Sequence, residues 1–366
     1  MHTSTANWRS EQKSCRKESW TTMGICKKCL LNDNLPSVRI DNDGICNYCN
    51  TAFPDALMKR NTADGRFVSE LSFDEEFAAA LEKFRDRKYQ VIMAYSGGKD
   101  STYTLKLIRE KYYASILAVT FNNGFLSESS LGNINRVTDY LGIDSLIVKY
   151  PSNKLVSAFQ YVEDGRVFPR TSLERASPIC NLCIMLIKNM IYYEAIVRNI
   201  PIICFGWTPG QVETAKPLLK LNYRMVAKVF DNIKSAITDK FGNDYEKYFL
   251  DHEFMKANED RVPYLYYPFV NNGYSECRIL EEIKGIGWEM PGNTDGNSSN
   301  CLLNSYANQS HVERFGYHPY AFEISSMVRN GYMTREEGMK KLENVKNDSS
   351  FEQISTIFRN AGKTPV

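Results

Sequence analysis

The sequence predicts an α/β fold in which helices cover both faces of a parallel sheet, with a small cysteine-rich module before it. Three observations predict this arrangement. Four short apolar runs after residue 90 alternate with segments whose apolar residues recur at helical spacing. Two adjacent glycines join the first apolar run to the first helical segment. Two C-x-x-C pairs lie close together within residues 24–52.

The apolar runs and helical patterns give the expected order of elements. Strands are expected at 91–95, 114–121, 145–150 and 200–206. Helices are expected near 100–112, 129–141 and 184–198. The aromatic and acidic stretch 236–299 breaks the alternation, which predicts an insertion or lid. A last helix should begin at Thr334, because Thr334 and Glu337 have the spacing of a reciprocal cap.

Composition and charge narrow the class of protein. The 366 residues are 43% hydrophobic and 24% charged, which is typical of a globular protein. The net charge of +2 argues against binding of nucleic acid through overall electrostatics, although a local basic patch is compatible with it. No apolar run approaches the length of a membrane span, and residues 1–23 lack the apolar core of a secretion signal. We therefore expect a cytoplasmic protein without a membrane partner.

The turn after the first strand, Ser96–Ser101, has the sequence S-G-G-K-D-S. Adjacent glycines let the backbone approach a ligand closely, and the next helix aims unpaired N–H groups at it. The N–H groups and both serine hydroxyls would cradle phosphates, Lys99 would offset their charge, and Asp100 would help to hold Mg²⁺. The alternative is a Gly-Gly turn in an α/β protein that binds no nucleotide.

This turn resembles the PP-loop of the ATP pyrophosphatase family, whose signature S-G-G-x-D-S follows the first strand of a parallel sheet. The resemblance implies an adenine nucleotide α-hydrolase-like fold, cleavage of ATP to AMP and pyrophosphate, and adenylation of a substrate carbonyl oxygen. It also implies that adenine lies against the backbone of 120–124, with Gly206 in the same pocket. The expected ATP site comprises Ala94, Tyr95, Ser96, Gly97, Gly98, Lys99, Asp100, Ser101, Phe121, Asn122 and Gly206.

Cys26, Cys29, Cys46 and Cys49 have the paired-knuckle spacing of a zinc site. Four thiolates can close around zinc and leave no open position, so we interpret the site as structural. A module of this size has too little core to fold without such a metal. Four unligated thiols are the alternative.

A second group of cysteines consists of Cys180 and Cys183, which open a helix, and Cys301 in a Gly/Asn-rich loop. The positive end of the helix should lower the thiol pKa values of the pair. A C-x-x-C pair with one distant cysteine in a PP-loop protein resembles the [4Fe–4S]-dependent tRNA-thiolation enzymes. The resemblance implies that the three cysteines hold a cluster whose fourth iron stays open to bind sulfide. Direct persulfide chemistry and purely structural cysteines remain alternatives.

The family resemblance leaves the nucleophile open. The segments "CKKCLLNDNLPSVRIDNDGICNYC" and "MVRNGYMTREEGMKKLE" resemble N-acetyl sugar amidotransferases, which adenylate a carboxyl group and admit ammonia. The segment around Cys301 resembles sulfur-inserting PP-loop enzymes, including the sulfur transferase of thioguanine biosynthesis. We favour a sulfurtransferase that acts on a small molecule or nucleobase, with Lys99, Asp100, Cys180, Cys183 and Cys301 as catalytic residues. Sugar amidation and tRNA thiolation are the alternatives, and a zinc-ribbon protein that binds nucleic acid is opposed by the intact S-G-G-K-D-S motif.

The expected cofactors are ATP, Mg²⁺, Zn²⁺ and a [4Fe–4S] cluster; the expected partners are the substrate and a sulfide-generating enzyme, and the sequence allows a homodimer. The segments are a disordered leader (1–23), a zinc-binding module (24–52), a helical connector (53–88), a PP-loop ATP-binding domain (89–235), an insertion or lid (236–300) and a C-terminal helical part that completes the catalytic domain (301–366).

Two further groups have no assigned role. Lys216, Lys220, Arg224 and Lys228 recur every four residues, which predicts one helix face that either contacts phosphate or is solvated. His311 and His318 are either acid–base groups in a pocket or part of an aromatic core segment.

Overall fold

The computed structural model describes residues 24–50, 70–212, 217–292, 294, 297–298, 300–343 and 348–361. The predicted leader 1–23, the first part of the predicted connector 53–88, and Lys216 lie outside these residues.

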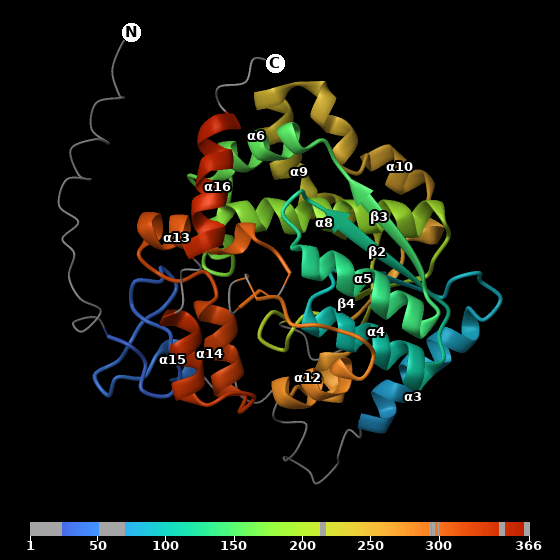
Figure 1. Ribbon diagram of the computed structural model, residues 1–366, viewed down its shortest axis with the longest axis horizontal. Helices are drawn as coiled ribbons and strands as arrows, with labels where there is room; N and C mark the ends of the chain where they lie inside the picture. The colour runs from blue at the N-terminus through green and yellow to red at the C-terminus, as the bar shows by residue number, and fades with distance from the viewer. Residues whose placement is uncertain are drawn as a thin grey trace.

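A six-stranded sheet in the order β3-β2-β1-β4-β6-β5 forms the centre of the fold (Figure 1). Five strands are parallel, with Val91 of β1 beside Ile116 of β2 and Ile202 of β4. The strands are β1 (Val91–Ala94), β2 (Ile116–Asn122), β3 (Asp144–Lys149), β4 (Ile202–Phe205), β5 (Leu218–Lys220) and β6 (Tyr264–Tyr266). The α/β fold with a largely parallel sheet is confirmed.

Strands β5 and β6 were not predicted from the sequence. Their pairing shows that two expectations, an all-parallel sheet and a separate insertion or lid, were wrong. β5 pairs antiparallel with β6, so the sheet is mixed rather than parallel throughout. β6 lies within the segment that we expected to be an insertion or lid, yet it pairs with β4 inside the sheet. Three residues are too few to show a strand period in the sequence, and only the pairing with β4 reveals them.

Alternate strand residues face two separate cores, as the period of two requires. Ile92, Leu117 and Ile203 face one core, which is closed by α6, α8, α9, α13 and α16. Val91, Ala118 and Ile202 face the other, which is closed by α3, α4, α5 and α12. Helices therefore cover both faces of the sheet.

The helices are bounded as follows. In the first half of the chain they are α1 (Asn47–Asn50), α3 (Glu70–Lys83), α4 (Lys99–Tyr112), α5 (Glu128–Leu141), α6 (Ser152–Val162), α7 (Arg170–Leu173) and α8 (Pro178–Val197). In the second half they are α9 (Tyr223–Phe241), η2 (Asn243–Tyr248), α10 (His252–Ala257), η3 (Glu259–Arg261), α11 (Phe269–Asn272), α12 (Glu276–Lys284), α13 (Leu303–Phe315), α14 (Ala321–Arg329), α15 (Arg335–Glu343) and α16 (Asp348–Ala361).

Local capping explains where several helices begin. Ser127 accepts from the Ser130 N–H at the start of α5, and Ser177 accepts from the Cys180 N–H at the start of α8. The predicted reciprocal cap is present before α15. The Thr334 N–H donates to Glu337 at 2.8 Å, and the Glu337 N–H donates to Thr334 Oγ1 at 3.2 Å.

The cysteine-rich module lies against the C-terminal helices α14 and α15, although they are distant in sequence (Figure 1). Leu31 and Leu35 of the module share a core with Phe322 of α14. Arg335 of α15 donates to the carbonyl of Cys29 at 3.2 Å and to that of Cys26 at 3.4 Å. The cysteine-rich module and the helices α14 and α15 therefore stabilise each other.

Among the described helices, α8 is long and apolar enough to cross a membrane by length and composition. The sequence-based expectation that no apolar run approaches a membrane span does not hold for this helix. Half of its apolar window is buried inside the fold, where α8 packs against β1, β2 and β4. Burial against the sheet accounts for its composition.

Candidate active site

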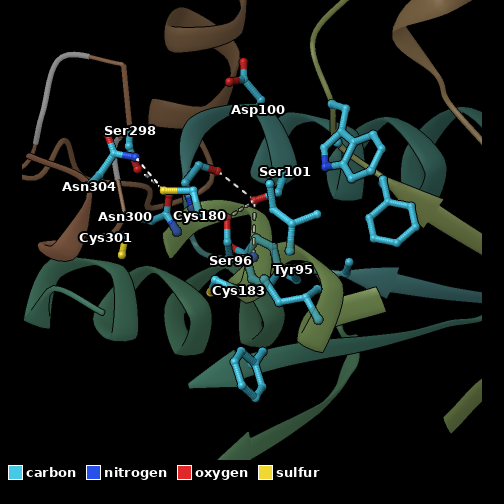
Figure 2. Close-up of a pocket in the computed structure, with 18 of the residues that line it drawn as sticks. Tyr95, Ser96, Asp100, Ser101, Cys180, Cys183, Ser298, Asn300, Cys301 and Asn304 are labelled. Carbon is cyan, nitrogen blue, oxygen red and sulfur yellow. Dashed lines mark hydrogen bonds between the residues drawn. The ribbon is translucent and has the colours of Figure 1, made fainter. Parts of the chain in front are cut away.

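A cavity of about 290 Å³ opens at the carboxyl ends of β1, β2 and β4. Its wall includes Ser96, Gly98, Lys99, Asp100 and Ser101. These residues belong to the turn after β1 and the first residues of α4, which together we call the phosphate loop (Ser96–Ser101). Figure 2 shows this loop beside the thiols of Cys180, Cys183 and Cys301, which line the same cavity. The carboxyl ends of parallel strands are the usual ligand-binding edge of such a sheet.

The phosphate loop has the geometry of an anion site. Gly97 has φ of +72°, and a Cβ there would lie 2.4 Å from the Ser130 carbonyl oxygen, so only glycine fits. The hydroxyls of Ser96 and Ser101 lie 3.1 Å apart. Since α4 begins directly after Gly98, its unpaired N–H groups and positive end face the loop.

Gly206 at the end of β4 permits a close approach of two backbones. A Cβ at this position would lie 2.6 Å from Ser101 Cα and 2.9 Å from the Ser101 nitrogen. The fourth strand therefore meets the start of α4 at the cavity wall, where both residues lie.

Lys99 and Asp100 take part in a polar network with Tyr274, just before α12, and Glu276, the first residue of α12. Lys99 Nζ lies 2.8 Å from Asp100 Oδ2, 2.9 Å from the Tyr274 hydroxyl and 3.5 Å from Glu276 Oε1. The Tyr274 hydroxyl also lies 3.0 Å from Asp100 Oδ1. Burial opposes the charge of Lys99, but Asp100, Tyr274 and Glu276 raise its pKa above the usual range. Lys99 therefore carries its positive charge beside the expected phosphates.

The three cavity thiols are held by separate parts of the fold. Cys180 and Cys183 lie in the first turns of α8. Cys301 forms an isolated antiparallel bridge with Leu126, just after β2. The Leu302 N–H donates to the Phe125 carbonyl at 2.9 Å, which fixes the loop on this side. Residues more than 100 positions apart thus meet in one cavity.

Each of these thiols lies near an amide donor. Asn123 Nδ2 lies 3.5 Å from Cys183 Sγ and 3.7 Å from Cys301 Sγ, and Asn304 Nδ2 lies 3.8 Å from Cys180 Sγ. The Asn123 amide oxygen accepts from the Phe125 N–H at 2.9 Å, so its nitrogen faces the two sulfurs. Amide donors stabilise negative sulfur, and a metal–sulfur group would place such sulfur here.

The expectation that the helix end lowers the thiol pKa values does not hold for Cys183. Burial raises the pKa of Cys183, and Cys301 adds to the shift. Burial also raises the pKa of Cys301. The loss of hydration outweighs the helix dipole, because the dipole is worth little beside full desolvation of an ion.

The four cysteines of the N-terminal module meet the geometry of one metal ion. Their sulfurs all lie within 4.8 Å of one another. Cys29 Sγ and Cys46 Sγ are 3.7 Å apart, and two tetrahedral thiolates at about 2.3 Å from zinc would be about 3.8 Å apart. Hydrogen bonds among these thiols lower the pKa of Cys29 and raise the pKa values of Cys46 and Cys49, so Cys29 is the thiol that most readily becomes a thiolate. These residues fit a closed tetrahedral site. Within the described part of the chain, the three cavity thiols do not form a group this tight, and a multi-iron cluster accommodates wider spacing than one ion.

The phosphate loop has the S-G-G-x-D-S motif of the PP-loop ATP pyrophosphatases, and it follows β1 of a largely parallel sheet. No protein-family model matches it. Among curated proteins, an uncharacterized protein of Methanocaldococcus jannaschii is 24% identical over 272 residues, which are 74% of this chain and 78% of the relative.

Three solved structures are similar to this chain at low TM-scores. U34-tRNA thiolase NcsA of Methanococcus maripaludis, solved with its [4Fe–4S] cluster, is 16% identical over 77% of this chain and 83% of its own, with a TM-score of 0.32. NH3-dependent NAD synthetase of Campylobacter jejuni is 14% identical over 57% of this chain and 99% of its own, with a TM-score of 0.30. NMN synthetase of Francisella tularensis is 11% identical over 77% of this chain and 96% of its own, with a TM-score of 0.34.

Most of the predicted PP-loop ATP residues lie at the cavity, with two exceptions. The cavity is lined by Ala94, Tyr95, Ser96, Gly98, Lys99, Asp100, Ser101, Phe121 and Gly206. Gly97 shapes the loop without lining the cavity. Asn122 instead accepts from the Gly124 N–H through its side chain, and the neighbouring Asn123 lines the cavity.

The histidines and the basic residues lie elsewhere. His311 and His318 are buried among Phe315, Tyr317 and Tyr320, and burial lowers their pKa values to about 3 and about 4. They therefore belong to an aromatic core segment. The single basic helix face was a wrong prediction, because Lys220 lies in β5 whereas Arg224 and Lys228 lie in α9.

Several residues at or near the cavity carried no usable signal in the sequence. Asn123, Asn304 and Tyr274 lie in segments of ordinary polar composition, and their role depends on contacts across the fold. Glu323 of α14 is hydrogen-bonded by the Thr208 hydroxyl at 2.8 Å. Burial raises the pKa of Glu323 to about 7, with a contribution from Asp100. This carboxyl is a candidate proton carrier near the phosphate loop.

Proposed function

We propose that this chain is an ATP-dependent sulfurtransferase. It adenylates a carbonyl oxygen of a small molecule or nucleobase, such as a guanine nucleotide, and replaces that oxygen with sulfur. The observation that carries the proposal is one cavity lined by both the phosphate loop and the thiols of Cys180, Cys183 and Cys301. ATP chemistry alone gives no reason for three distant cysteines to meet there.

The phosphate loop would bind the triphosphate, with Asp100 holding Mg²⁺ and Lys99 offsetting the phosphate charge. The substrate carbonyl oxygen attacks the α-phosphorus and pyrophosphate leaves. The former carbonyl oxygen is then bonded to AMP, which is a good leaving group. A sulfur nucleophile attacks the carbon, and AMP departs with the oxygen. Fixing these groups in one cavity supplies much of the acceleration.

The residues around the thiols fit a [4Fe–4S] cluster held by Cys180, Cys183 and Cys301. Amide nitrogens face all three sulfurs, and the thiols come from two elements that can enclose a group larger than one ion. When bound, such a cluster would supply an iron with an open coordination position for sulfide. Zinc at Cys26, Cys29, Cys46 and Cys49 would be structural, because four thiolates leave no open position.

The proposal has consequences for partners and location. A sulfide-generating enzyme would supply the sulfur, and the thiols require a reducing compartment such as the cytoplasm. The near-neutral net charge favours a small substrate over tRNA. A homodimer is compatible with the proposal.

The first test is the metal and sulfide content of anaerobically purified protein. We expect about four irons, matching acid-labile sulfide and one zinc per chain. Cys301→Ser should lose the iron but keep ATP binding, whereas Asp100→Ala should lose pyrophosphate release but keep the iron. Full activity of Cys301→Ser would contradict the cluster.

The second test compares nucleophiles and substrates by pyrophosphate release and product mass. We expect turnover with sulfide and a carbonyl-bearing nucleobase. Zinc without iron after reconstitution, together with turnover on ammonia and a sugar carboxylate, would replace the proposal with amidation. Thiolation of tRNA but of no small molecule would change the substrate class.

A further inference from the structure

We propose that Trp288 is a positioning residue that fixes the orientation of the Gly97–Gly98 peptide in the phosphate loop. The proposal rests on the proposed function, since it concerns the same ATP site. Trp288 follows α12 and is 3% exposed. Its indole N–H donates to the Gly97 carbonyl oxygen at 2.9 Å, across 191 positions of sequence. Trp288 is not among the residues that line the cavity, so its action is indirect.

The Gly97–Gly98 peptide needs an external constraint. Both flanking residues are glycines, with φ of +72° at Gly97 and −79° at Gly98. Without side chains, rotation of this peptide by half a turn meets little steric resistance. The carbonyl and the N–H of one trans peptide point in opposite directions, so fixing the carbonyl also fixes the N–H.

Two buried donors hold the carbonyl away from the cavity. Besides Trp288, Asn133 Nδ2 lies 3.3 Å from the Gly97 oxygen. Asn133 is itself oriented by Glu289, whose N–H donates to the Asn133 amide oxygen at 2.9 Å and whose carbonyl accepts from Nδ2 at 2.8 Å. The segment after α12 therefore constrains the loop both directly and through Asn133.

The opposite side of this peptide faces the expected phosphates. Gly98 lines the cavity, and its nitrogen lies 3.4 Å from the Ser96 hydroxyl. A rotated peptide would replace this N–H donor with a carbonyl oxygen, which repels phosphate. Under this proposal Trp288 acts on the phosphates that leave as pyrophosphate, which AMP lacks, and makes no contribution to binding of the adenosine.

The test replaces the indole N–H while keeping its shape. In the full-length protein, Trp288 is exchanged for 3-benzothienylalanine, which has sulfur in place of the N–H, and in parallel for phenylalanine (Trp288→Phe). Binding of Mg²⁺–ATP, inorganic pyrophosphate and AMP is measured by calorimetry. We expect ATP and pyrophosphate to bind about 3- to 10-fold more weakly, as for the loss of one hydrogen bond, with AMP unchanged.

The control removes a similar bond elsewhere. Tyr245→Phe removes a donor to the Lys154 carbonyl at 3.2 Å, away from the loop, and should leave all three affinities unchanged. Equal weakening of AMP would show a general structural role for Trp288 and overturn the proposal, as would unchanged pyrophosphate binding by the benzothienyl variant. If the unmodified protein bound neither ATP nor pyrophosphate, the proposed function itself would fall.

Discussion

Two buried asparagines define the surroundings of the three cavity thiols. Asn123 and Asn304 are each 4% exposed. A buried carboxamide is costly unless its polar atoms are satisfied, and here their nitrogens face sulfur. These amide donors favour negatively charged sulfur at Cys180, Cys183 and Cys301. They therefore support a metal-binding role for the three cysteines more strongly than the cysteines do alone.

Asn123→Asp should weaken iron binding about 10- to 100-fold, as for loss of a residue that orients metal ligands. The carboxylate keeps the shape and still accepts from the Phe125 N–H, but it repels thiolate. Iron per chain after reconstitution and the visible spectrum are the measurements. Asn189→Asp is the control, since Asn189 is equally buried and bonds Leu250 instead. Equal iron in the Asn123 variant and the unmodified protein would contradict this role.

Glu323→Gln should change how stability depends on pH. The folded protein keeps a proton on Glu323 up to about pH 7, whereas the ordinary pKa is 4.5. The folded state therefore binds more protons between these values, and stability falls as pH rises through this window, by about 3 kcal/mol. Between pH 5 and pH 7.5, urea unfolding should show the unmodified protein losing about 2 kcal/mol of stability relative to Glu323→Gln. The comparison is made between variants because the lowered pKa values of His311 and His318 stabilise both proteins as the pH rises. Glu281→Gln, at an exposed position of α12, should keep the loss.

At the scale of the element, the cavity exists because β4 lies directly against the start of α4. The contact between Gly206 and the Ser101 backbone leaves no room for a Cβ. The segment around α12 also contacts the phosphate loop. Tyr274 and Glu276, at the start of α12, contact Lys99, and Trp288, after its end, donates to Gly97. The segment that we expected to be a lid is thus part of the loop's fixed surroundings.

Gly206→Ala should destabilise the protein by about 1–3 kcal/mol, because backbone atoms must move to admit the methyl group. It should also weaken ATP binding at least about tenfold, since the start of α4 shifts with Ser101. Thermal unfolding and ATP titration measure both effects. Gly292→Ala is the matched control, because a Cβ there has no atom of the described residues within 4 Å. If both variants behaved alike, the close approach at Gly206 would be unimportant.

At the scale of the whole molecule, the cysteine-rich module braces the elements that carry the cavity. The Ser37 N–H and hydroxyl donate to Glu174 at 2.6 and 2.7 Å, just before α8 begins. Asn34 donates to the Gly316 carbonyl at 2.9 Å, and Arg329 of α14 lies 3.6 Å from Cys29 Sγ. A metal that keeps this module folded would therefore also help to hold α8, which carries Cys180, and α14, which carries Glu323.

Cys46→Ser should lose the zinc and lower the Tm by roughly 5–10 °C, because the module has too little core to stay folded without its metal. Iron retention should fall as well, although Cys46 is not a cavity residue. Metal analysis and thermal unfolding test this, and a chelator should reproduce it. Cys277→Ser, at an exposed cysteine of α12, should change neither quantity. Unchanged iron in a zinc-free variant would show that the module and the cavity are independent.

Local patterns in the sequence were sufficient for the central strands, the phosphate loop and the paired cysteine knuckles. Val91–Ala94 and Ile116–Asn122 are buried on both faces, so they read as continuous apolar runs. The loop and the knuckles depend on residues that are neighbours in the chain, where spacing alone constrains geometry. The cap at Thr334 is local in the same way.

Only the tertiary structure revealed contacts between distant segments. β6 is three residues long and exists through its pairing with β4, and the bond from Trp288 to Gly97 crosses 191 positions. The pKa of Cys183 likewise depends on burial by several elements, which overrides the local helix end. The position of the phosphate loop after the first strand was therefore readable from adjacent residues. Its meeting with three thiols in one cavity was decided by packing, because no local sequence pattern specifies which distant segments come together.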